Sequence, residues 1–224
     1  MIKQFTFNHY EVNCYIIYDG DACAIVDPGA AASYEDAQIA QFIEEQHLKP
    51  TLVLLTHAHV DHIAGLRQVC ERYGLPVTLH ADGQILLKQA TAYADIMGFD
   101  IQPMGGLATR CVGDGDLIDL HSGAILPQTT ALDQSGVIEC RHVPGHCPGS
   151  LCYVIHGEQT VLTGDALFHL SIGRTDLPGG DYPTLIEKLK TRVLSLPDDY
   201  KVLPGHAIPS NIGKERLHNP FLSN

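Results

Sequence analysis

The segment Thr56-His57-Ala58-His59-Val60-Asp61-His62 places three imidazoles and one carboxylate within six residues. It directly follows residues 51–55 (TLVLL), a continuous apolar run that predicts a short strand buried on both faces. Imidazole and carboxylate groups bind divalent zinc, iron, manganese or nickel. A solvated turn is the alternative, but a turn does not require four such groups. Because ligands in layered α/β folds gather beyond the carboxyl ends of strands, the segment predicts a metal site there.

Three later pieces of the chain each present one more candidate ligand. Residues 144–146 (PGH) form a turn between two predicted strands, whereas 162–165 (LTGD) and 203–206 (LPGH) each end a strand. A single histidine after glycine is more often structural, but the three pieces together would deliver one ligand each to the same rim. The glycine before each ligand allows a sharp turn and close packing. We therefore expect distant segments to converge on one site.

The rest of the chain predicts strands, then helices, then strands and a late helix. An antiparallel meander is expected over residues 5–26, and further strands over 77–80, 137–143, 151–155, 160–162 and 201–203. A first helix is expected from about Tyr34, with Ala40, Ile43 and His47 on one face, and a second over residues 63–73. A third is expected after Asp82 as its cap, with one face formed by Leu86, Ala90, Tyr93 and Met97. A late helix is expected over residues 182–196 with Asp181 as its cap. Residues 98–136 predict loops and strands. The order favours two packed sheets with helices outside, and the absence of a linker favours one domain over residues 1–224.

Composition and charge exclude several classes of function. Of the 224 residues, 45% are hydrophobic, which suffices for a core, and the net charge of −12 without a Lys/Arg cluster disfavours nucleic acid as a partner. No apolar run approaches the roughly 18 residues that would span a bilayer, so no membrane association is expected. The first residues show no secretory signal, and seven cysteines without a C-x-x-C pair indicate reduced thiols. These features predict a cytoplasmic protein.

In this order, H-x-H-x-D-H, P-G-H, T-G-D and P-G-H resemble the metallo-β-lactamase superfamily over residues 10–210. The resemblance implies an α/β fold, the αβ/βα sandwich of two mixed β-sheets flanked by helices. It also implies two divalent metal ions, zinc first, with iron or manganese as alternatives. By that resemblance the first ion is held by His57, His59 and His146, the second by Asp61, His62 and His206, and Asp165 bridges them. A carboxylate suits the bridge because its two oxygens can each bind one ion.

The segment over residues 168–176 (FHLSIGRTD) resembles the loop after the bridging aspartate in glyoxalase II and its short bacterial, hydroxyacylglutathione hydrolase-type relatives. Class B β-lactamases usually have cysteine at the position of Asp165, and flavodiiron proteins have glutamate at that of His59. The resemblance links Arg174 to substrate binding, since arginine is always charged and can fork onto a carboxylate. A loop ion pair is the alternative. Typical glyoxalase II has tyrosine at the position of Asp176 and a helical C-terminal domain, so glutathione would be held differently here, or the substrate is another thioester.

The expected reaction is hydrolysis of a small-molecule thioester such as S-lactoylglutathione by metal-bound hydroxide. Asp61 is the candidate catalytic residue, because it can bind the second metal and orient the hydroxide proton. Three alternatives remain at this point: a persulfide dioxygenase with one iron at the positions of His57, His146 and Asp165, a hydrolase of lactones or phosphoesters, and a metal-binding module without turnover.

Overall fold

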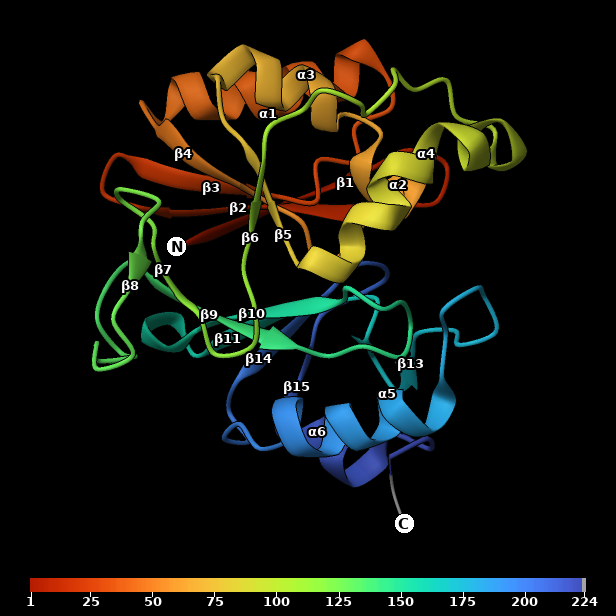
Figure 1. The fold of residues 1–224 in the computed structure, drawn as a ribbon. Helices are drawn as coiled ribbons and strands as arrows, with labels where there is room; N and C mark the ends of the chain where they lie inside the picture. The colour runs from red at the N-terminus through yellow and green to blue at the C-terminus, as the bar shows by residue number, and fades with distance from the viewer. Residues whose placement is uncertain (223–224) are drawn as a thin grey trace.

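The computed structural model describes residues 1–222, and its two large sheets lie face to face between outer layers of helices (Figure 1). The first sheet has the order β1-β2-β3-β4-β5-β6, with bounds Ile2–Phe7, Val12–Asp19, Ala22–Val26, Lys49–Leu54, Val77–Leu79 and Thr109–Cys111. Pairs β1·β2 and β2·β3 are antiparallel, whereas β3 to β6 pair in parallel. The expected N-terminal meander is confirmed.

The second sheet has the order β15-β14-β11-β10-β9-β7-β8. Its bounds are Ser210–Asn211, Lys201–Pro204, Thr160–Gly164, Leu151–Ile155, Val137–His142, Leu117–Asp119 and Ile125–Leu126. Only β11 and β14 pair in parallel, so this sheet is mixed as well. The predicted fold class, a sandwich of two mixed sheets flanked by helices, is confirmed. A small hairpin, β12 (Leu167–Phe168) with β13 (Ser171–Ile172), follows β11.

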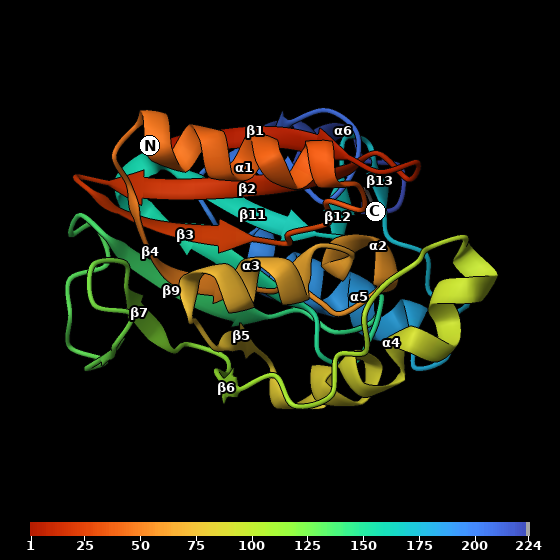
Figure 2. The same cartoon turned by 90° about the horizontal axis from the view of Figure 1, so that it is seen from above.

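Helices cover the outer face of each sheet. On the first sheet lie α1 (Ser33–Glu45), α2 (Val60–Ile63), α3 (Leu66–Tyr73) and α4 (Gln84–Met97), and Figure 2 shows α1 and α3 running over the strands. On the second lie α5 (Tyr182–Lys188), which continues as a π-helical turn over Leu189–Val193, and α6 (Ile212–His218) (Figure 1). None of the helices within residues 1–222 combines the length and apolar composition needed to cross a membrane.

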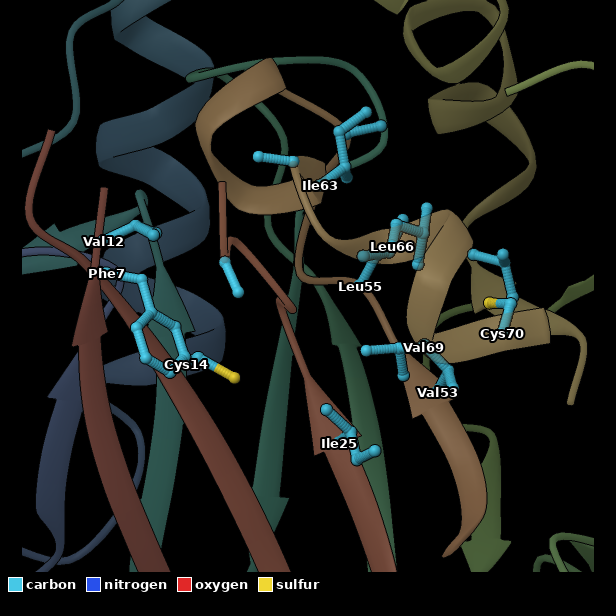
Figure 3. Packing of buried hydrophobic residues seen from close by; sticks show 14 of the residues in the cluster. Phe7, Val12, Cys14, Ile25, Val53, Leu55, Ile63, Leu66, Val69 and Cys70 are labelled. Carbon is cyan, nitrogen blue, oxygen red and sulfur yellow. The ribbon is translucent and has the colours of Figure 1, made fainter. Parts of the chain in front are cut away.

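Strand β4 shows why the apolar run before the histidine segment is continuous. Leu52 and Leu54 point into the core between the sheets, whereas Val53 and the following Leu55 pack under the helices. Successive strand residues face opposite sides, so a strand covered on both faces has no polar position. Figure 3 shows Val53 and Leu55 beside Leu66 and Val69 of α3. A third cluster packs the second sheet against α5 and the turn after it.

Two predicted helix faces are wrong by a small rotation. In α1 the buried positions are Glu35, Ile39 and Ile43, whereas Ala40 is half-buried and His47 is exposed beyond the helix end. In α4 the buried positions are Leu87, Ala90 and Ala94, and Asp82 lies in the preceding 3₁₀ turn rather than at the cap.

Both helices are half-exposed, so apolar residues also occur on their solvent side and blur the periodicity. The predicted Asp181 cap of the late helix is confirmed, because its side chain accepts from the Thr184 N–H at 2.8 Å. The helical segment ends at Val193 rather than at residue 196, and Tyr182 is exposed.

Candidate metal centre

Five of the seven candidate ligands stand after strand ends, and the other two lie in the short helix α2. His57 follows β4, His59 caps α2, and Asp61 and His62 lie within α2. The other three come from the second sheet: His146 from the β9–β10 turn, Asp165 from the end of β11 and His206 from the end of β14. The sandwich therefore brings the two groups together at one end of the sheet interface, as the sequence predicts.

The ligand atoms form three overlapping sets, each within 4.8 Å: His57, His59 and His146; His57, His62 and Asp165; and Asp61, His62 and His206. In the first set Nδ1 of His59 lies 2.9 Å from Nε2 of His146. In the last set Oδ2 of Asp61 lies 3.1 Å from Nε2 of His206. The first and last sets are the two ligand triads that the family resemblance implies.

Asp165 lies between the two triads. Its Oδ1 is 3.2 Å from Nε2 of His62, and its Oδ2 is 3.6 Å from Nε2 of His206 and 3.8 Å from Nε2 of His146. One carboxylate therefore reaches ligands of both sets, which is the placement that a bridging group needs.

The donor set fits divalent metal ions. Among residues 1–222, Nε2 of His57, Nε2 of His62 and Oδ1 of Asp165 are buried without a hydrogen-bond partner. Buried polar atoms in folded proteins are almost always satisfied, because an unpaired one costs roughly 1–3 kcal/mol. Three such atoms at one place are explained by cations that they would ligate, through imidazole and carboxylate groups suited to zinc, iron or manganese.

A fixed outer layer orients the ligand rings. Nδ1 of His62 lies 3.0 Å from Asp27, and Nδ1 of His146 and of His206 lie 2.8 and 2.9 Å from the backbone oxygens of Arg174 and Tyr10. Each of these contacts uses Nδ1 and leaves Nε2 for an ion. These roles carry no sequence signal, because Asp27-Pro28-Gly29 has the composition of an ordinary turn and a backbone acceptor can be any residue.

The glycines before the ligands meet the expectation of close packing. Gly164 has φ 49°, a left-handed conformation that favours glycine. A Cβ atom on Gly205 would overlap Oδ1 of Asp165 and Cε1 of His62. The backbone before His206 therefore approaches the centre more closely than any side chain would allow.

Burial and mutual charge set the protonation of the ligands. Burial lowers the pKa of His59 to about 4, with His146 adding to the effect, and burial among other imidazoles holds the pKa of His57 well below its usual range. Both rings are therefore neutral at pH 7 and available as ligands. Burial opposes ionisation of Asp165, but His62 and His206 outweigh it and lower the pKa of that carboxyl.

Arg174 stands beside the centre but is already paired. Its Nε and Nη2 donate to the two oxygens of Asp176 at 2.8 and 2.7 Å, and both side chains are exposed. The loop ion pair considered for Arg174 is therefore present. Its backbone oxygen still binds His146, so the loop is fixed to the first ligand triad.

A further group, His80, Asp82 and His142, has less suitable geometry. The two imidazoles stack at 3.8 Å between centroids and 9° between planes. Nitrogen lone pairs lie in the ring plane, so parallel stacked rings do not direct them at one ion. In the first triad the rings of His57 and His59 stand at 85°.

Comparison with known proteins agrees with the fold and the site. The chain is 36% identical to the probable metallo-hydrolase YqgX of Bacillus subtilis, over 95% of this chain and 93% of that protein. It is 32% identical to the hydroxyacylglutathione hydrolase GloC of Haemophilus influenzae, over 96% and 94%.

Three solved structures are similar over nearly the whole chain. They are the B3 metallo-β-lactamase BLEG-1 (TM-score 0.85, 30% identity, all of both chains), TTHA1623 in a di-iron-bound form (0.82, 32%, 98% of this chain and 100% of that one) and ETHE1 from Myxococcus xanthus (0.75, 25%, 98% and 83%).

Fold, ligand cluster and relatives together define a metal-dependent hydrolase. The model of the metallo-β-lactamase superfamily matches residues 8–206, and the chain belongs to that superfamily.

Proposed function

We propose that the protein hydrolyses a small anionic thioester, such as S-lactoylglutathione, with two divalent metal ions, zinc first. The observation that carries the proposal is the position of His146. Its Nε2 faces His59 in the first triad, and its Nδ1 bonds the backbone of Arg174. The backbone of a candidate anion binder is thus hydrogen-bonded to a candidate ligand of the reaction centre. The 32% identity to GloC supports the same substrate class.

The chain's own residues would divide the work as follows. His57, His59 and His146 would hold one ion, Asp61, His62 and His206 the other, and Asp165 both. When bound, such ions lower the pKa of a bound water, so that a hydroxide nucleophile is available at neutral pH, and they polarise the substrate carbonyl. Asp61 would orient the proton of the attacking water through its carboxylate. A thiolate leaves readily, so no strong general acid is required.

Arg174 would hold the anionic end of the substrate. The fork to Asp176 uses Nε and Nη2 and leaves Nη1, which bonds no other described residue, for a substrate carboxylate. A charge-assisted hydrogen bond is about twice as strong as a neutral one. We also propose that the protein acts in the cytoplasm on a small-molecule substrate and does not bind nucleic acid.

The test is metal analysis of protein purified without added metal, together with a thiol-release assay on S-lactoylglutathione. The proposal expects two ions per chain and thiol release that a chelator abolishes. Hydrolysis of lactones, phosphoesters or β-lactams without thiol release would contradict the proposed thioester substrate but would agree with a metal-dependent hydrolase. The likeness to BLEG-1 is the reason to include a β-lactam.

A persulfide dioxygenase is the second candidate, because that class is similar to this chain in the first histidine motif and in the G-R-T-D sequence over residues 173–176. It would use one iron at the positions of His57, His146 and Asp165. One iron per chain with oxygen uptake on glutathione persulfide would support it and contradict thioester hydrolysis.

A further inference from the structure

The start of β2 runs beside the segment that carries His206. The backbone N–H of Asn13 donates to the oxygen of Gly205 at 2.7 Å, and Val12 pairs with His206 as an isolated bridge. The side-chain Nδ2 of Asn13 donates to the oxygens of Pro204 and Ala207, each at 3.0 Å. One residue thus contacts backbone oxygens on both sides of His206.

The orientation of this amide is fixed by its other end. Oδ1 of Asn13 accepts from Nε2 of Gln4 at 2.8 Å and from Oγ1 of Thr6 at 3.1 Å, both on the neighbouring strand β1. A reversed amide would bring its oxygen against two carbonyl oxygens and its N–H groups against two donors. Asn13 is 1% exposed, so water cannot replace these partners. All four hydrogen-bonding positions of the amide are therefore in use.

Ala207 is held in a conformation that its side chain disfavours. Its φ is 63°, in the left-handed region, although it is exposed and is not glycine. A residue with a Cβ atom adopts this conformation only when its surroundings enforce it. The hydrogen bond from Asn13 to the Ala207 oxygen is such a restraint. It lies one residue from His206, whose Nε2 faces Asp61.

We propose that Asn13 is a positioning residue for the second metal ion, because it holds Ala207 left-handed and so keeps His206 aimed at Asp61. The inference rests on the proposed two-metal centre. Loss of Asn13 acts on one ion selectively, since His57, His59 and His146 are fixed by other segments. Sequence alone offers no sign of this role, because Asn13 lies 191 and 194 positions before Pro204 and Ala207 in the chain.

The experiment counts zinc ions that remain on the purified protein at graded chelator concentrations. In Asn13→Ala the second ion should be released at roughly 10–100-fold lower chelator concentration, the usual effect of removing an outer partner of a ligand. The first ion should be released as in wild type. Thr51→Val is the matched control, because it removes a hydroxyl that bonds the backbone oxygens of Cys23 and Leu120 in β3 and in the segment after β7. It should retain both ions.

A rescue variant separates positioning from general destabilisation. Glycine adopts positive φ without strain, so Ala207→Gly in the Asn13→Ala protein should restore much of the affinity for the second ion. Ala207→Val, in the presence of Asn13, should weaken the second ion, since a β-branched residue tolerates this φ poorly. Ala207 is exposed, so this variant does not depend on core packing and remains informative if Asn13→Ala fails to fold.

Three results would overturn the inference: unchanged affinity in both Asn13→Ala and Ala207→Val, equal loss of both ions, or no rescue by glycine. A wild-type protein that binds fewer than two ions would overturn the proposed centre and this inference together. If wild type binds two ions and the variants bind both ions with unchanged affinity, only the inference about Asn13 is overturned.

Discussion

Nδ1 of His62 lies 3.0 Å from Oδ2 of Asp27, and both side chains are buried. Asp27 also accepts from the backbone N–H and the hydroxyl of Thr56, the residue before the first ligand. One carboxylate therefore orients a ligand ring and anchors the strand end that carries the histidine segment. Because Nδ1 is engaged, Nε2 of His62 is the atom that faces Asp165.

Asp27→Asn should weaken metal binding. An amide in place of the carboxylate removes negative charge and presents N–H groups to donors that need an acceptor. We expect roughly 10–100-fold lower affinity, measured by competition with a chromogenic chelator. Asp95→Asn, a change at an exposed position of α4, is the control and should bind metal as wild type does. Equal affinities for all three proteins would contradict the orienting role.

Asp165→Ala should lower bound metal toward zero and abolish turnover. The two oxygens of Asp165 face ligands of both triads, so its loss affects both ions. Metal content per chain and thiol release measure the two effects. Asp176→Ala removes a nearby carboxylate outside the triads and should retain both ions. Two ions and full turnover in Asp165→Ala would defeat the assignment of the bridge.

Gly205→Ala should destabilise the protein and reduce its metal content. The new methyl group would overlap Asp165 and His62, so the backbone before His206 must shift. Gly105→Ala is the matched control, since a Cβ atom there would meet nothing within 4 Å. Thermal melting and metal analysis of the pair check the prediction, which fails if the two variants behave alike.

Arg174→Met should raise KM for S-lactoylglutathione about tenfold or more and leave kcat nearly unchanged. The loss corresponds to one charge-assisted hydrogen bond, worth about 1.5–3 kcal/mol. A thioester of a neutral thiol, such as N-acetylcysteamine, should be hydrolysed equally well by both proteins, because it offers Arg174 no anion. Parallel loss on the two substrates would assign Arg174 to the fold instead of the substrate.

Glu139→Gln should remove an acid-dependent part of stability. Glu139 accepts from Arg141 and lies 2.7 Å from His156. Burial opposes its ionisation, but His156 and Arg141 outweigh it and lower the pKa of Glu139 from 4.5 to about 2. A folded-state pKa below the unfolded value stabilises above pH 4.5, and the contribution disappears as the pH falls to about 2.

The lowered pKa of Glu139 corresponds to about 3 kcal/mol in the free energy of unfolding. Urea unfolding across this pH range should show that slope in wild type and a shallower one in Glu139→Gln. Equal slopes would assign acid sensitivity to other groups.

The candidate ligands and most of the strands could be predicted from the sequence because both depend on local signals. Three of the candidate ligands directly follow a glycine, and the other four lie in one segment after a buried strand. An apolar run such as residues 51–55 identifies that strand without further context. Motif order and resemblance then supplied which ligands share an ion.

The outer partners of those ligands could not be predicted. Tyr10 and Arg174 act through backbone oxygens, and Asn13 meets its partners only after the two sheets dock. Helix α6 was also missed. Its seven residues are too few for a clear period, and its buried Glu215 bonds the backbone N–H of Leu170 instead of facing solvent.

The ligands come from both sheets, and this origin has a mechanical consequence. Four arise around β4 and α2, and three from strand ends of the opposite layer. An ion that binds groups from both layers links the two sheets and stabilises only the arrangement in which they are docked. The folded population then depends on the concentration of free metal. A lack of metal would therefore destabilise the docking of the two sheets at the ligand end, without any substitution in the chain.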